Sequence, residues 1–436
     1  MTLEGDWGMQ PRKFYGWKLL AVLWLILFVN FAFPIYGSGV ISGYMVAALH
    51  FDRRTLGIIF AVFYWMHGMP GPLVAFCVNK KGARFTLILG GLLLCLGAFA
   101  MALLVLSSVQ IAIVFGVIIG LGTSAGGMLP AQSVMARWFV RRKAAAISLL
   151  LTGSGTGGII APVLLNRIIS LAGGNWRVGW WLVSGMCLVT TLLALFFVKE
   201  RPSDVGQVPD GRLDRVTASV KARRGVYRTA SDWTYSEVLR SPVLWLLLVA
   251  NLGYSFGMPA FLSHGIVHLR DLGHSPAEAA FSFSVMAIAS LIGHFVVAAL
   301  GDHIEPKLIW AAALLVSAMS FVLAVHTTGA VSMYLCAACM GLGFGSIIPA
   351  MMTVPVNYFG ATPYPFVVGI ILAFGTTAGA IGVYLCGYGY DHFGSYAGPF
   401  YSIATLCVLG SVVLLGIKPP RRGVAPILVA TANSHS

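Results

Sequence analysis

Residues 281–307, FSFSVMAIASLIGHFVVAALGDHIEPK, decide the fold of this chain. The run is apolar, carries one ionisable side chain, His294, and ends in a short charged turn that begins at Gly301. In a helix that rises 1.5 Å per residue, His294 lies about 12 Å from Asp302, close to the middle of a hydrocarbon layer roughly 30 Å thick. An ionisable group at that depth is costly, so His294 is a candidate functional residue.

The composition extends this interpretation to the whole chain. Charged residues make up 10% of the sequence and hydrophobic residues 58%, with a mean hydropathy of +0.86, whereas a soluble domain is about 25% charged. Backbone groups in lipid must bond within their own segment, and these runs are too long for barrel strands, so we expect an all-α membrane protein. Twelve transmembrane helices are expected, at 17–39, 55–77, 86–106, 110–136, 144–168, 177–198, 242–266, 275–300, 308–326, 330–356, 365–388 and 397–417.

One long polar segment, 199–240, separates the sixth span from the seventh. Its composition predicts a solvated, partly disordered linker between two six-helix halves. The expected divisions are therefore 1–198, the linker 199–240, 241–418, and a cytoplasmic tail at 419–436.

Most of the 28 lysine and arginine residues fall on one side of this arrangement. If the N-terminus is cytoplasmic, the residues left for the other side are Arg53, Arg54, Arg167, Arg177 and Arg270. The positive-inside rule then places both termini and the linker in the cytoplasm, in a cell inner (plasma) membrane. The net charge of +14 is thereby explained by topology: anionic lipid headgroups are the expected partner, and nucleic acid is not.

The two halves repeat each other. The fourth span contains GLGTSAGGMLPAQSVMARWF and the tenth contains GLGFGSIIPAMMTVPVNYF. Both begin Gly-Leu-Gly, carry a central proline (Pro130 or Pro349) and end in an aromatic residue followed by Phe. Two six-span repeats joined by a basic linker indicate a rocking transporter, with its site near the midplane between the halves.

Over essentially its whole length the chain resembles the major facilitator superfamily. The turns NKKGAR (79–84) and GDHIEPK (301–307) resemble the Gly-x-x-x-Asp-Arg-x-Gly-x-Arg loop of that family, with Asn79 in place of the Asp and Asp302 retained. Three further segments resemble the oxalate–formate antiporter and monocarboxylate transporter branch: FYGW (14–17), RWF with RRK (137–143) and SEVLRSP (236–242).

The chain departs from that branch at one position. The branch usually has a Gly-Arg pair eight residues before the Asp of the second turn, and this arginine binds the substrate carboxylate; here the pair is Gly293-His294. The lysine that oxalate carriers add in span eleven is absent as well, since 365–388 holds no charge. A guanidinium is permanently charged and forked, whereas an imidazole carries one pH-dependent charge. The resemblance therefore implies a small organic anion, and the substitution argues against a dicarboxylate.

His294 and His67 are the two ionisable candidates within the membrane, because all fourteen carboxylates fall at helix ends or in loops. A bound anion favours a protonated imidazole, so a substrate anion could bind with its own proton, which amounts to symport. The alternative for each histidine is a neutral ring hydrogen-bonded to a neighbouring helix.

Polar or aromatic residues in Gly- and Pro-rich spans complete the expected substrate site: Asn30, Tyr36, Gln132, Asn251, Tyr254 and Thr377. Helix packing is the alternative role for each, since small and hydroxyl residues also serve helix contacts. Tyr36 and Tyr254 are the stronger candidates, because a ring with a hydroxyl suits a mostly apolar pocket.

The charged turns are expected to latch the cytoplasmic helix ends when the protein is open outward. Asp302 with Lys307, and Asn79, Lys80 and Arg84, are the candidates; the alternative is that they only signal topology. All seven cysteines lie in apolar runs, so we expect no disulfide, metal site or cofactor.

These features predict a secondary active transporter, functional as a monomer, that moves a small monocarboxylate-like anion by alternating access. The main alternative is a carrier of a neutral or aromatic compound, such as a vitamin-like heterocycle, a siderophore or a drug. A receptor would usually carry a soluble signalling domain and an enzyme would need buried catalytic pairs, and neither is visible in the sequence.

Overall fold

The computed structural model describes residues 14–49, 53–211 and 226–420. The predicted tail beyond 420 and the middle of the linker lie outside these ranges. Within them, twelve helical segments are long and apolar enough to cross a membrane. They run Tyr15–Ser42, Gly57–Lys81, Ala83–Leu103, Ser108–Trp138, Lys143–Leu171, Arg177–Phe197, Pro242–Asp271, Phe281–Leu300, Pro306–Val325, Ala330–Phe359, Tyr364–Phe393 and Ala397–Gly416. The predicted number of spans is confirmed, and most boundaries agree within a few residues.

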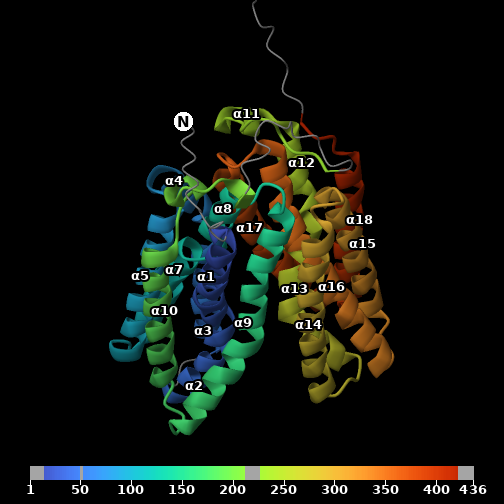
Figure 1. The fold of residues 1–436 in the computed structure, drawn as a ribbon. Helices are drawn as coiled ribbons and strands as arrows, with labels where there is room; N and C mark the ends of the chain where they lie inside the picture. Colours follow the sequence, from blue (N-terminus) through green and yellow to red (C-terminus); the bar gives the residue numbers. More distant parts are fainter. Residues whose placement is uncertain (1–13, 50–52, 212–225, 421–436) are drawn as a thin grey trace, which may run out of the picture.

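The helices form two bundles side by side (Figure 1). The first is built from α1 (Tyr15–Asn30), η1 (Phe33–Gly37), α2 (Ser38–Leu49), α3 (Arg53–Gly68), α4 (Gly71–Lys81), α5 (Ala83–Leu103), α6 (Ser108–Ile111), η2 (Ala112–Ile119), α7 (Gly120–Ala125), α8 (Met128–Trp138), α9 (Lys143–Leu171) and α10 (Arg177–Phe197). The second is built from α12 (Pro242–Ala250), α13 (Leu252–Asp271), α14 (Pro276–Leu300), α15 (Pro306–Val325), α16 (Ala330–Phe359), α17 (Tyr364–Phe393) and α18 (Ala397–Gly416).

The stretch that decides the fold forms α14 for clear local reasons. Ser275 caps its start by accepting a hydrogen bond from the amide of Glu278, and the Glu278 carboxylate accepts one from the amide of Ser275. The helix ends at Gly301, and Pro306 then starts α15 at a position where its missing N–H costs nothing. Close packing fixes α14 against α16: a Cβ on Gly345 would lie 2.1 Å from the carbonyl oxygen of Ser290.

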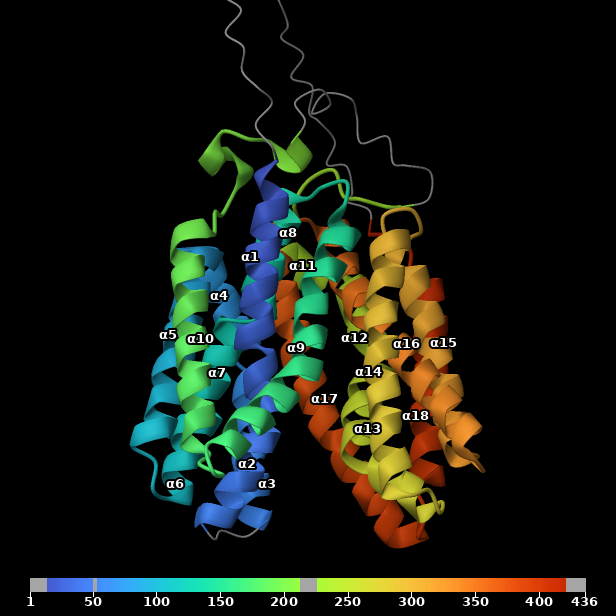
Figure 2. The same cartoon turned by 60° about the horizontal axis from the view of Figure 1, so that its bottom comes forward.

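Both bundles begin and end at the same end of the molecule, which we call the linker end. There the Tyr15 amide donates to the side chain of Gln207, and the Tyr227 hydroxyl donates to the carbonyl of Pro420. The bundles pack together at the linker end and diverge toward the opposite, far end (Figure 2).

The described parts of the linker contain local structure that the composition does not indicate. They form the short turns η3 (Pro202–Val205) and η4 (Pro209–Gly211) and the helix α11 (Tyr235–Arg240). Backbone bonds from Thr229 to Asn357 and from Trp233 to Phe359 dock the second part onto α16. The sequence did not indicate this docking, because it depends on helix ends distant in the chain.

Candidate functional site

His294 lies on α14 with its ring held in one orientation. The ring is 5% exposed, and Nδ1 lies 2.7 Å from the carbonyl oxygen of Ser290, one turn earlier. Since that carbonyl can only accept, Nδ1 must carry a proton, and the lone pair of the neutral ring is on Nε2. No described residue hydrogen-bonds Nε2. This nitrogen is therefore available to a ligand.

The helical position of His294 places it between the two bundles. Leu291 of α14 touches Gly155 of α9, while Gly293 of α14 lies against α16, where Ser346 Oγ donates to its carbonyl at 3.4 Å. At 100° per residue, His294 falls between these two faces. His294 is therefore on the side of α14 nearest the seam, the line where α9 of the first bundle meets α16 of the second.

His67 is surrounded by aromatic rings on the first bundle. Its ring lies edge-on to Phe31, with centroids 5.5 Å apart, and stacks near Phe63 at 6.3 Å. Its Nδ1 is buried and has no hydrogen-bond partner among the described residues. An imidazole nitrogen left without a partner in an apolar setting is costly, so His67 stays a candidate for a substrate contact.

Tyr36 has a tyrosine near it in each half. The Tyr36 ring packs against Gly158 of α9, and Tyr36 lies close enough to Tyr64 of α3 and Tyr254 of α13 to interact with both electrostatically. The Tyr254 hydroxyl donates only to the sulfur of Met258, at 2.9 Å, a weak acceptor. Tyr64 was not among the residues expected at the site, because it lies far from Tyr36 in the sequence and only the fold brings the two together.

The remaining polar candidates each make hydrogen bonds within the protein, although Gln132 Nε2 and Asn251 Oδ1 are buried without a partner among the described residues. Asn30 binds the Gly126 carbonyl and accepts from Thr190, and Asn251 Nδ2 donates to Ser255, which fixes both within their own bundles. Gln132 accepts from the hydroxyl of Tyr364 across the interface at 3.3 Å, close to the linker end. Thr377 bonds its own helix and reaches Met69 Sδ at 3.4 Å. Of these, Gln132 and Thr377 join the halves, while the asparagines support helix packing.

The expected latch is only partly assembled as predicted. The Asp302 carboxylate accepts the amides of Ala144 and Ala145, at 3.2 and 3.1 Å, which start α9 in the other half. A helix amino end favours a negative charge, so this contact joins the halves at the linker end. Burial raises the pKa of Asp302, although the two amides and the guanidinium of Arg228 oppose the shift.

Lys307, Arg84 and Lys80 do not bridge the halves in this structure. Lys307 donates to the carbonyl of Ile417, and the Arg84 guanidinium donates to the carbonyl of Leu195. Lys80 lies over the ring of Phe76, 5.5 Å from its centroid, and Asn79 is exposed. Asp302 is paired instead by Arg228, a linker residue that composition could not single out.

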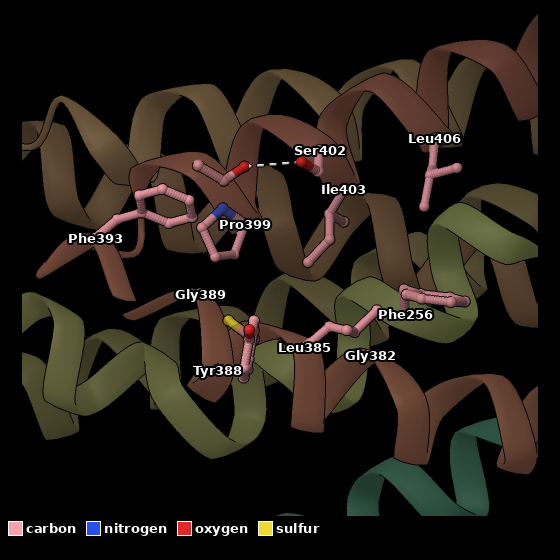
Figure 3. A pocket seen from close by; sticks show the side chains of 12 residues that line it. Phe256, Gly382, Leu385, Tyr388, Gly389, Phe393, Pro399, Ser402, Ile403 and Leu406 are labelled. Carbon is pink, nitrogen blue, oxygen red and sulfur yellow. Dashed lines mark hydrogen bonds between the residues drawn. The ribbon is translucent and has the colours of Figure 1, made fainter. Parts of the chain in front are cut away.

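A separate pocket of about 370 Å³ lies within the second bundle, between α13, α17 and α18 (Figure 3). Its walls are mainly apolar, and the Ser402 hydroxyl donates a hydrogen bond to the carbonyl of Gly398. The lining residues are Phe256, Gly382, Leu385, Cys386, Tyr388, Gly389, Phe393, Gly398, Pro399, Ser402, Ile403 and Leu406. None of the expected substrate residues is among them, so this pocket and the seam at His294 are different places.

Comparisons with known proteins agree with this geometry. The model of the Major Facilitator Superfamily matches residues 22–362 and 265–430. Monocarboxylate transporter 2 of Homo sapiens is 24% identical over 426 residues, covering 93% of this chain and 86% of that protein. Monocarboxylate transporter 13 of Bos taurus is 25% identical over 405 residues, covering 92% and 89%. The transporter FucP, solved in the outward conformation, shares the fold with a TM-score of 0.71 at 17% identity, covering 92% of this chain and 99% of that one.

Proposed function

Because this chain belongs to the Major Facilitator Superfamily, we propose that it is a secondary active transporter that moves a small organic monoanion together with a proton. Transport would proceed by alternating access, with the substrate held in the seam at His294. The similarity to monocarboxylate transporters over most of the chain supports the substrate class.

The free Nε2 of His294 is the observation that carries the proposal. With Nδ1–H committed to Ser290, a neutral ring can only accept a hydrogen bond at Nε2, so it cannot hold a carboxylate. Protonation turns Nε2 into a charged donor, and a carboxylate then binds with a strong hydrogen bond. Each bound anion therefore brings one proton, and both leave when the site opens on the other side. A permanent guanidinium would lack this coupling.

The tyrosines supply neutral donors for the same carboxylate. Tyr36, Tyr64 and Tyr254 come from both halves, so a substrate bound between them is contacted by both bundles. Hydrogen bonds that require both halves favour a closed, loaded state, which is what a carrier needs before it reopens.

The linker end would face the cytoplasm. This topology leaves five basic residues for the other side: Arg53, Arg54, Arg167, Arg177 and Arg270. They lie at the start of α3, near the end of α9, at the start of α10 and near the end of α13, all at the far end. The positive-inside rule then makes the far end external, in a plasma or inner membrane.

A second candidate is a carrier of a neutral or aromatic compound. The ring of His67 between Phe31 and Phe63 favours it, because flat aromatic walls stack well on a heterocycle. His294 would then accept a hydrogen bond from an N–H or O–H of the substrate.

Uptake into proteoliposomes separates these candidates. Under an inward proton gradient, we expect labelled lactate, pyruvate or acetate to accumulate, and a protonophore to abolish the accumulation. His294→Gln keeps a donor but cannot titrate, so we expect exchange to persist without dependence on pH; His294→Ala should reduce uptake at least tenfold. Unchanged pH dependence in His294→Gln, or competition by heterocycles but not by monocarboxylates, would remove the anion proposal.

A further inference from the structure

The linker is fastened to both halves by two matched aspartates. Asp210 accepts the amides of Val140 and Arg141, 3.2 and 2.8 Å away, just after α8. Asp232 accepts the amides of Ala361 and Thr362, at 3.0 and 3.1 Å, just after α16. α8 and α16 carry the repeated sequence and end at corresponding positions. The linker is therefore anchored at equivalent points of the repeat.

Arg228 stands between these anchors and contacts both halves. Its Nη2 donates to the carbonyl of Arg141 in the first half, at 3.0 Å, and to Asp302 Oδ1 in the second half, at 3.3 Å. The side chains of Arg228 and Asp302 are 17% and 8% exposed. The same Asp302 carboxylate accepts the first amides of α9. Three parts of the chain thus meet at one buried carboxylate.

The backbone around Arg228 is bound to the second half. The amide of Tyr227 donates to Glu305 at 2.7 Å, and the amide of Thr229 donates to the carbonyl of Asn357 at 2.8 Å. The arginine will therefore move with the second bundle. When the bundles separate at the linker end, its bond to Arg141 and the bonds from α9 to Asp302 are therefore among those that break.

We propose that Arg228 is a positioning residue of the transport cycle, which holds Asp302 on the amino end of α9 and so keeps the linker end closed. This inference rests on the proposed alternating access. The physical reason is desolvation, because a carboxylate buried at an interface needs compensating partners. Without the Arg228 guanidinium, only the amides of α9 would compensate the buried charge of Asp302, and solvation of that charge would favour the open state. A residue of the linker thereby stabilises the closed linker end.

Distances between spin labels test this without any substrate. Labels at Val140→Cys and Ile304→Cys report on the linker end, and labels at Leu171→Cys and Val331→Cys report on the far end, in a chain whose native cysteines are replaced. All four side chains are exposed. Arg228→Ala should increase the population with a separated linker end about tenfold or more, the expected value for a hydrogen bond to a charged group. Arg228→Lys should recover part of the effect, because it keeps the charge but loses the fork.

Arg240→Ala is the matched control, since Arg240 is exposed at the same end and has no ion pair among the described residues. In an Asp302→Asn background, Arg228→Ala should change the distances little further, because both substitutions remove the same ion pair. In transport assays the Ala variant should alter the exchange rate more than the substrate affinity. Distances in Arg228→Ala equal to those of the unchanged chain, or shifted equally by Arg240→Ala, would overturn the proposal. A chain that transports no anion but shows the expected distances would refute only the proposed function.

Discussion

At the scale of single residues, the roles here are set by which atom of a side chain is already occupied. The sequence marks His294 as a buried titratable group, but only the bond from Nδ1 to Ser290 assigns the free lone pair to Nε2. The same reasoning separates Asn30, whose amide and carbonyl oxygen are both used inside the first bundle, from the tyrosines. Spacing in a sequence predicts which face a residue occupies, and it cannot predict which of its atoms is left for a ligand.

Asp302 gives a prediction for pH. Burial raises its pKa when the linker end is closed, and the pKa returns toward its ordinary value when separation of the halves solvates the carboxyl. The closed state therefore takes up protons more readily, so acidification favours it, and this contribution is lost as pH rises through the raised pKa. We expect the closed population, measured by the linker-end distance, to rise as pH falls through the raised pKa of Asp302, and Asp302→Asn to flatten the profile.

Glu305 is the control for this titration. Burial also raises its pKa, but its amide partner Tyr227 moves with the same half, so opening leaves its surroundings unchanged. Glu305→Gln should keep the pH profile of the unchanged chain. A closed population that falls on acidification would contradict the assignment of the titrating group to Asp302.

At the scale of helices, the contact between α4 and α17 sets how closely the halves approach. A Cβ on Gly71 would lie 2.6 Å from the carbonyl oxygen of Gly369, and one on Gly369 would lie 2.6 Å from that of Gly71. The backbones touch, so a methyl group at either position must push the helices apart. We expect Gly71→Ala or Gly369→Ala to destabilise the closed state by about 1–3 kcal/mol. The linker-end distance should then be longer and the melting temperature lower.

Gly185→Ala supplies the comparison, because a Cβ there meets nothing within 4 Å. Alanine is favoured over glycine within a helix by roughly 1 kcal/mol, so this variant should be at least as stable as the unchanged chain. If Gly71→Ala behaves like Gly185→Ala, α4 and α17 do not limit the approach of the halves.

Helices also show where the repeat in the sequence ceases to predict structure. The tenth span is one continuous helix, α16, whereas the corresponding fourth span is divided into α6, η2, α7 and α8. The break falls at Gly126 and Gly127, where the second half has Gly345 and Ser346. Two consecutive glycines weaken a helix, and at this break the Asn30 side chain donates a hydrogen bond to the carbonyl of Gly126. Spans, halves and the polarity of the linker follow from local patterns, while this break and the docking of the linker depend on distant partners.

At the scale of the whole molecule, the bundles meet at the linker end and part at the far end. The side-chain hydrogen bonds that join them directly include those of Asp302 with the start of α9, Gln132 with Tyr364, and Thr377 with Met69. Access from the far end should therefore reach Tyr36, which is 37% exposed, and not Gln132, which is fully buried. With the proposed orientation, we infer that this arrangement corresponds to an outward-open carrier.

Thiol labelling in vesicles or cells tests this state and its sidedness together. In a chain without its native cysteines, a membrane-impermeant maleimide added outside should modify Tyr36→Cys and spare Gln132→Cys. Val331→Cys, 83% exposed at the far end, should react from outside in every state, whereas Val140→Cys should react only after permeabilisation. Arg228→Ala should slow Tyr36→Cys and make Gln132→Cys reactive from the cytoplasmic side, because opening one end of a rocking carrier closes the other. If Tyr36→Cys is labelled only after permeabilisation, the proposed orientation is wrong. If Tyr36→Cys and Gln132→Cys are labelled equally from one side, the interface is a continuous pore and the halves do not alternate.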